Sequence, residues 1–238
     1  SGNNMGDKGA KALARALEGN ETLEELNLLA NAFGETGANA LLPHAKIIGA
    51  SLGWKADKSE KWDLSGKKLT DGDMLLIEPL LRTMPNLKEL NLSDNNIGDE
   101  GCRTIAPALR TMPNLKILFL SRNNIGDEGC RTIAPALRTM PNLKALYLHN
   151  NNIGDEGLAV LSNVVSAIPL LGYLHLFDNK IGNVGCQCLL ELIENDSLQS
   201  LTYLVLQKNP NISSEELKTK FKRVWREKGK NPDELWFF

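Results

Sequence analysis

Residues 115–142 read LKILFLSRNNIGDEGCRTIAPALRTMPN, and the rest of the chain consists of variations on this stretch. The run from Asn95 to Lys116 occurs again, unchanged, from Asn123 to Lys144, a shift of 28 residues. Apolar anchors recur at the same step, at Ile97, Ile125, Ile153 and Ile181. A fixed period between 20 and 50 residues indicates a protein built from stacked repeats.

Each repeat has a strand half and a helix half. In the segment that begins at Leu115, apolar residues alternate up to Leu120, which predicts a short strand with one buried face. From residue 126 to 140 the apolar spacing is helical, and Asp127 and Glu128 lie where a helix amino end favours negative charge. Pro141 then ends the helix before the next strand.

The strand and the helix of one unit need different amounts of space. Neighbouring strands lie about 4.8 Å apart, whereas packed helices need roughly 8–10 Å. Stacked units must therefore bend, with the sheet inside the curve and the helices outside. We predict an α/β solenoid, shaped as a horseshoe, with a parallel sheet on its concave side and helices on its convex side.

The pattern L-x-x-L-x-L-x-x-N, followed by I-G-D-E-G and a helix, resembles the leucine-rich repeat in its long, ribonuclease-inhibitor-like class. NOD-like receptors and Ran GTPase-activating proteins carry similar units. The resemblance implies a right-handed α/β horseshoe over residues 1–212, with about seven strands. Residues 213–238 are expected to form a C-terminal capping helix and tail.

Two irregularities lie near the start of the chain. Residues 1–7 align with residues 93–99, so the chain starts in mid-repeat, and we expect it to be part of a longer protein. Residues 23–31 are predicted to form the first complete strand. The interval from Phe33 to Leu69 is eight residues longer than the usual 28, which places an insertion within residues 43–58. This insertion is either a binding loop, with Trp54 as a possible secondary contact, or a tolerated surface loop.

The recurring asparagines and cysteines are predicted to be structural. Asparagine follows the strands at Asn31, Asn95, Asn123, Asn151, Asn179 and Asn209, where in leucine-rich repeats it hydrogen-bonds the turn backbone. Cys102, Cys130 and Cys186 share one helix phase, which is typical of small buried packing residues. Unpaired cysteines in this pattern favour a reducing compartment, and we predict a cytoplasmic protein.

The side chains between the strand leucines should face the concave side, because residues alternate across a strand. Phe119, Tyr147, His175 and Val205 share one column, so adjacent members should lie about 5 Å apart. We predict that a partner contacts this aromatic part of the face, at Phe119, Tyr147, His149, Tyr173, His175, Phe177, Tyr203 and Val205. The alternative is that these rings only pack on each other, since β-sheets favour aromatic residues.

Composition and motif content exclude several classes of function. A net charge of -2 predicts no general attraction to nucleic acid or to an anionic membrane. No phosphate-binding loop, zinc-protease motif or nucleophile elbow occurs, so no catalysis, cofactor or small-molecule substrate is predicted. His149 and His175 lie on adjacent strands, but only the distant Asp178 could complete a ligand set, and we predict no metal site.

The predicted cap helix is strongly basic. Ser213, Ser214 and two acids open it, and Leu217, Phe221, Val224 and Trp225 form its apolar stripe. Seven cations follow between Lys218 and Lys230. They form either a solvated cap surface or a contact for an acidic partner or RNA.

The leading hypothesis is a non-catalytic, monomeric domain that binds a protein or peptide on its concave face, as a sensor or scaffold part of a larger intracellular protein. Two alternatives come from the resemblance. A GTPase activator of the Ran-specific type carries an acidic tail, whereas the tail here is basic. An enzyme inhibitor like the namesake of the class is much longer and richer in cysteine. A free-standing structural spacer is the remaining possibility.

Overall fold

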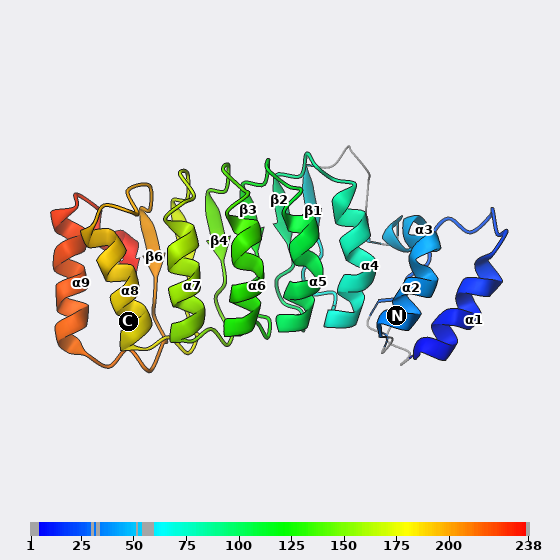
Figure 1. Cartoon of the computed structure of the whole chain (residues 1–238), viewed down its shortest axis with the longest axis horizontal. Coiled ribbons are helices and arrows are strands. Elements are labelled where there is room, and N and C mark those ends of the chain that lie inside the picture. Colours follow the sequence, from blue (N-terminus) through cyan, green and yellow to red (C-terminus); the bar gives the residue numbers. More distant parts are fainter. Residues whose placement is uncertain (1–4, 30, 32–33, 51, 54–59, 237–238) are drawn as a thin grey trace.

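The computed structural model describes residues 5–29, 31, 34–50, 52–53 and 60–236. Figure 1 shows an elongated array in which helices run side by side along one flank of a sheet. The helices are α1 (Asp7–Leu17), α2 (Glu35–Leu41), η1 (Leu42–His44), α3 (Ala45–Ala50), α4 (Asp71–Arg82), α5 (Asp99–Leu109), α6 (Asp127–Leu137), α7 (Asp155–Val165), α8 (Asn183–Glu194), α9 (Glu215–Glu227) and η2 (Pro232–Glu234). Strand and helix alternate along most of the chain, so the α/β leucine-rich-repeat solenoid predicted from the sequence is confirmed.

The described part of the chain contains seven strands in one parallel sheet, in the order β1 to β7. They are β1 (Lys61–Asp63), β2 (Glu89–Asn91), β3 (Ile117–Phe119), β4 (Ala145–Tyr147), β5 (Tyr173–His175), β6 (Tyr203–Val205) and β7 (Leu235–Trp236). The central leucine of β2 pairs in register with that of β3, and the same holds through β6. Every unit therefore presents equivalent positions to the same face.

The core lies between the sheet and the helices. One continuous cluster of buried side chains extends from Leu29 to Leu235, and it includes the strand leucines, the anchors from Ile97 to Ile181 and three cysteines. All four cysteines are free, and Cys102, Cys130 and Cys186 are buried. Burial raises the pKa of Cys186 to about 12. Cys102, Cys130 and Cys186 thus act as small apolar residues of the core, as predicted.

A ladder of asparagines holds the turns after the strands. Asn123 donates from Nδ2 to the carbonyls of Leu120, at 3.2 Å, and of Leu92 in the previous repeat, at 2.9 Å. Its Oδ1 accepts from the Ile97 amide at 3.0 Å. Equivalent bonds form at Asn95, Asn151, Asn179 and Asn209. Each buried side chain satisfies backbone groups of two repeats, which confirms the structural role of this position.

A second ladder, which the sequence analysis missed, joins the amino ends of the helices. Asp127 was interpreted as a charge that suits its own helix, α6, but its Oδ1 accepts from the amides of Gly154 and Gly157 in the next repeat, at 2.7 and 2.9 Å. Asp99 and Asp155 repeat this arrangement. A Cβ on Gly157 would lie 2.4 Å from Asp127 Oδ1. Glycine therefore permits the close approach of the capping carboxylate.

The prediction of a first strand at residues 23–31 is wrong for the residues that are described there, 23–29 and 31. Their backbone forms no strand, and the Leu26 amide donates to the carbonyl of Ile47 in α3 at 3.0 Å. The longer repeat places α3 beside this segment, where a bond to β1 would otherwise form. The side chains of α1 and α2 pack in a smaller, separate cluster with Leu28 and Ile48. Trp54 lies outside the described residues.

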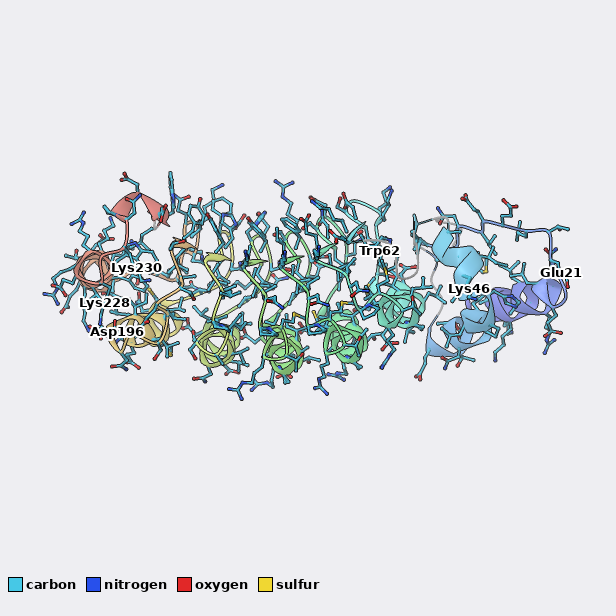
Figure 2. The ribbon with its side chains drawn as sticks, turned by 90° about the horizontal axis from the view of Figure 1, so that it is seen from above. Glu21, Lys46, Trp62, Asp196, Lys228 and Lys230 are labelled. Atoms are coloured by element: carbon cyan, nitrogen blue, oxygen red, sulfur yellow. The ribbon has the colours of Figure 1, made fainter. Side chains whose placement is uncertain are left out.

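The C-terminal end is covered by α9 and β7. Ser214 caps α9 by accepting from the Leu217 amide at 3.1 Å, and the four residues of the predicted apolar stripe are buried. Figure 2 shows Lys228 and Lys230 close to the end of α8, where Lys228 pairs with Asp196 at 2.7 Å. Only a tail was predicted to follow this helix. This tail adds β7 to the sheet, beside β6.

Candidate binding face

The concave face is formed by the strand side chains that alternate with the buried leucines. Phe119 pairs in register with Tyr147, Tyr147 with His175, and His175 with Val205. The predicted column therefore exists, and Trp236 of β7 continues it beyond Val205. A second column, closer to the start of each strand, brings Tyr173 beside Tyr203.

The rings of these columns contact each other. Phe119 and Tyr147 are stacked, with centroids 4.7 Å apart and planes 13° from parallel. His175 stacks against Tyr203 at 6.5 Å, and Tyr173 lies 5.5 Å from Tyr203. His175 also stacks against Phe177 at 6.3 Å, and the Lys208 ammonium lies 5.0 Å from the Phe177 centroid. Each of the predicted rings therefore packs against at least one other ring.

The exposure of the predicted contact residues is uneven. Of the predicted rings, Tyr173 is 48% exposed and the others are half-buried. Trp236, which was not predicted as a contact residue, is 45% exposed. Val205 is only 3% exposed. It was predicted as a contact residue like the rings, but the larger side chains around it leave it at the base of the face, with little surface of its own.

His149 and His175 form a close pair within this face. Their Nδ1 atoms lie 2.7 Å apart, and His149 Nδ1 also lies 2.8 Å from Ser121 Oγ. One ring must donate while the other accepts, so at least one of the two rings is neutral in this geometry. Burial, together with nearby His175 and Arg122, lowers the pKa of His149 to about 4, and burial lowers the pKa of His175. Within the described residues, no group of three or more histidine, cysteine or acidic side chains is placed to hold a metal ion.

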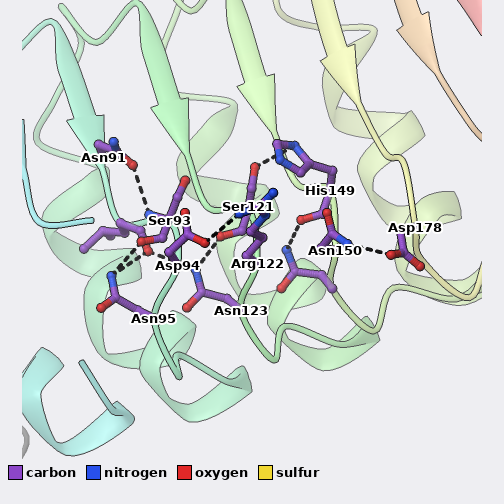
Figure 3. A network of polar contacts seen from close by, with 12 residues as sticks. Asn91, Ser93, Asp94, Asn95, Ser121, Arg122, Asn123, His149, Asn150 and Asp178 are labelled. Carbon is purple, nitrogen blue, oxygen red and sulfur yellow. Dashed lines mark hydrogen bonds and ion pairs between the residues drawn. The ribbon is translucent and has the colours of Figure 1, made fainter. Parts of the chain in front are cut away.

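Polar side chains border the face where the strands end. Asp94, Arg122, Asn150, Asp178 and Lys208 occupy equivalent positions and all have positive φ. Figure 3 shows how they pair: Arg122 contacts Asp94 at 3.1 Å, and Asn150 donates to Asp178 at 2.6 Å. These contacts link neighbouring repeats and fix the positions of the polar groups at the rim.

The face is hollowed at its C-terminal end. A depression of about 360 Å³ lies over Val205, with His175, Phe177, Tyr203 and Trp236 around it. The sequence analysis did not assign Trp236 to the face, because the last eight residues lack the repeat pattern. The only signal was the cluster of apolar residues after Pro232, which predicts burial but no strand register.

The basic residues of α9 and of the segment that follows it are largely engaged within the molecule. Lys220 pairs with Glu194 at 2.9 Å, and Lys218 pairs with Glu215 at 2.6 Å. Lys230 donates to the Leu198 carbonyl at 3.0 Å and lies 5.3 Å from the centre of the Trp225 ring. These contacts favour the cap interpretation over a surface for RNA or an acidic partner.

Two adjacent repeats differ almost solely on the concave face. Residues 87–114 and 115–142 can be aligned without gaps, and they differ at three of 28 positions. The changes replace Glu89 by Ile117, Asn91 by Phe119 and Asp94 by Arg122. The first two pairs lie on the exposed side of strands β2 and β3, and the third lies in the turn that follows them. The framework is thus constant while the surface changes from one repeat to the next.

Comparison with known proteins agrees with this fold. Residues 1–14, 83–106, 111–134, 139–162 and 169–190 match the family model described as Leucine Rich repeat. A ribonuclease inhibitor from Sus scrofa is 34% identical over 91 residues, which cover 38% of this chain. The match covers only 18% of the length of that inhibitor.

Two solved structures share the fold at low sequence identity. Actin-binding site 2 of leiomodin-1 covers 82% of this chain and 96% of its own, with a TM-score of 0.50 and 15% identity. The C-terminal domain of tropomodulin from Caenorhabditis elegans covers 66% of this chain and 93% of its own, with a TM-score of 0.54 and 20% identity. In the described part of this chain, every helix is too short or too polar to span a bilayer.

Proposed function

Since the chain is a leucine-rich-repeat protein of the ribonuclease-inhibitor-like class, we propose that it is a non-catalytic binding protein that holds a protein or peptide on its concave face. The observation that carries this proposal is the comparison of residues 87–114 with residues 115–142. A sheet needed only for support has no physical reason to change its exposed residues while its core and helices stay identical. A surface that recognises one partner needs different side chains at successive positions.

The chemistry of the face supports the same proposal. Tyrosine and tryptophan are enriched among the residues that contribute most to protein interfaces, and Tyr173 and Trp236 are both about half exposed. Tyr173 already lies against the Tyr203 ring, so little side-chain entropy is lost at Tyr173 when a partner binds. The aromatic end of the face, defined by Tyr147, Tyr173, Tyr203 and Trp236, is therefore the proposed centre of contact.

The test is capture of partners by immobilised protein. Replacement of both Tyr173 and Tyr203 by alanine should weaken binding by roughly 30-fold for each ring that acts as a hot spot. The matched control is Val184→Ala, because Val184 is an exposed apolar residue of α8 on the helical side. Circular dichroism checks that the variants fold. Capture that survives the double replacement, or is lost equally in the control, would place binding elsewhere on the molecule.

Three candidate partners or activities should be tested first. Actin is one candidate, because one of the solved structures that share this fold is an actin-binding site of leiomodin-1. At 15% identity, that likeness concerns the fold alone. Ribonuclease is the second, through the inhibitor relative. Stimulated GTP hydrolysis by a small GTPase is the third. Co-sedimentation, a ribonuclease assay and a GTP hydrolysis assay separate these alternatives directly.

A further inference from the structure

The hollow over Val205 has the shape of a site for one side chain. Strands β5 and β7 place His175 and Trp236 on either side of Val205 in the same column, two strand spacings apart. Two strand spacings correspond to about 10 Å. Since valine is much smaller than these rings, the column dips at this position. Tyr203 and Phe177 border the hollow as well, so its walls are mostly apolar.

The polar groups of the hollow include one cation and several neutral groups that can donate. Among the described residues that line it, Arg122 is the one with a permanent charge, and the lining includes no carboxylate. Asn150 and Gln207 add amide groups, and Lys208 adds a second cation beside Phe177. A surface with a guanidinium group and several neutral donors, but no carboxylate, is complementary to a negatively charged group.

The nearest carboxylates are already occupied. Asp178 accepts from Asn150, and Asp94 contacts a single terminal nitrogen of Arg122, at 3.1 Å. A guanidinium group has five N–H donors, and the Arg122 side chain is 63% exposed. Arg122 can therefore bind a partner carboxylate while it keeps its contact with Asp94, which holds it in place at the rim.

We propose that the hollow over Val205 receives an acidic segment of a protein partner, in which an apolar residue enters between His175 and Trp236 and an adjacent carboxylate binds Arg122. This inference rests on the proposed function and specifies the chemistry of the partner. The aromatic walls remove the apolar side chain from water, while the donors at the rim select for negative charge. A basic segment would meet Arg122 and Lys208 as like charges, so it should bind more weakly than an acidic segment.

The histidine pair should respond to such a partner. Arg122 and Asp94 face it from the rim, Tyr147 faces it from β4, and Tyr203 faces it from β6. A carboxylate bound nearby favours the imidazolium form. The pair can take up one proton at a free Nε2 while its Nδ1–Nδ1 hydrogen bond remains. Binding should then be accompanied by proton uptake, and it should be tighter near pH 6 than near pH 7.5.

The experiment is selection of random dodecapeptides, displayed on phage, against the immobilised whole chain. We expect the recovered peptides to combine Asp or Glu with a neighbouring apolar residue. A synthetic copy should bind Arg122→Gln at least about 10-fold more weakly than wild type, since it loses a charge-assisted hydrogen bond. Arg103→Gln is the matched control, because Arg103 is similarly exposed, at 59%, and pairs with Glu100 on the convex helix α5. Val205→Phe, which fills the hollow, should also abolish binding.

Three results would overturn the inference: peptides without acidic enrichment, equal binding to the two arginine variants, or no selected peptide at all. Each of these results can be distinguished from a result that refutes the proposed function itself. If capture of a protein partner is lost in the Tyr173 and Tyr203 double variant but is unchanged in Arg122→Gln, the concave face still binds and only the acidic segment is excluded. If capture survives in all concave variants, both proposals fail.

Discussion

Replacement of Asp127 by alanine should destabilise the array by removing a cap that links two repeats. Asp127 Oδ1 accepts two amide hydrogen bonds, from Gly154 at 2.7 Å and from Gly157 at 2.9 Å. Hydrogen bonds to charged groups contribute about 1.5–3 kcal/mol each, whereas loss of an ordinary N-cap costs about 1 kcal/mol. Gly154, the N-cap residue of α7, has no side chain of its own to replace the lost acceptor. Because Gly154 is only half-buried, water will restore part of the loss, and we expect roughly 2–4 kcal/mol.

Urea unfolding followed by far-ultraviolet circular dichroism measures this effect. For a chain of this length, a loss of 2–4 kcal/mol lowers the melting temperature by roughly 5–15 °C. Asp127→Asn retains a neutral acceptor and should lose about half as much. Glu128→Ala is the control, since Glu128 lies in the same helical turn but contacts only exposed Arg131, and it should change stability by less than about 0.5 kcal/mol. If Asp127→Ala is no less stable than Glu128→Ala, the proposed link between repeats is wrong.

Two further predictions concern titration and reactivity. Because the pKa values of His149 and His175 are lowered, the unfolded chain binds more protons than the folded chain below about pH 6.5. Their contribution to stability should therefore be complete above that pH and be lost as pH falls toward 4. As the pH is lowered, the urea midpoint of the variant with both histidines replaced by glutamine should fall less steeply than that of the wild type. Equal slopes of urea midpoint against pH for the two proteins would contradict this. A thiol reagent should modify one cysteine in the native protein, Cys188, and all four after denaturation, because only Cys188 is partly exposed. Rapid native labelling of Cys130 would contradict the buried assignment.

The sequence was sufficient to predict the repeats because their constraints are local and recur at one step. The leucine at each strand centre and the asparagine after it determine the register, so Phe119, Tyr147 and His175 could be placed in one column before any coordinates were known. The contacts of Asp127 could not be derived in the same way. The charge pattern indicates a helix amino end, but whether a carboxylate caps its own helix or the next one depends on the offset between repeats.

The two ends of the array were predicted less well, since there the period no longer applies. Residues 23–31 carry the strand pattern, yet in the described part the backbone bonds to α3, because the longer repeat brings that helix close to Leu26. At the other end, Trp236 joins the sheet from a segment without leucine spacing. In both places a tertiary contact, rather than local propensity, determines the pairing.

Ring packing and partner binding were posed as alternatives for the aromatic face, but the structure makes them compatible. Phe119 and Tyr147 are half-buried and stacked at 4.7 Å, so much of their apolar surface is already removed from water. Tyr173 and Trp236, by contrast, keep almost half of their surface exposed. Burial of that remaining surface stabilises a complex at about 25 cal/mol per Å², and the contact of Tyr173 with Tyr203 limits the entropy lost at Tyr173. The exposed rings should therefore contribute directly to affinity, whereas the stacked pair should contribute less.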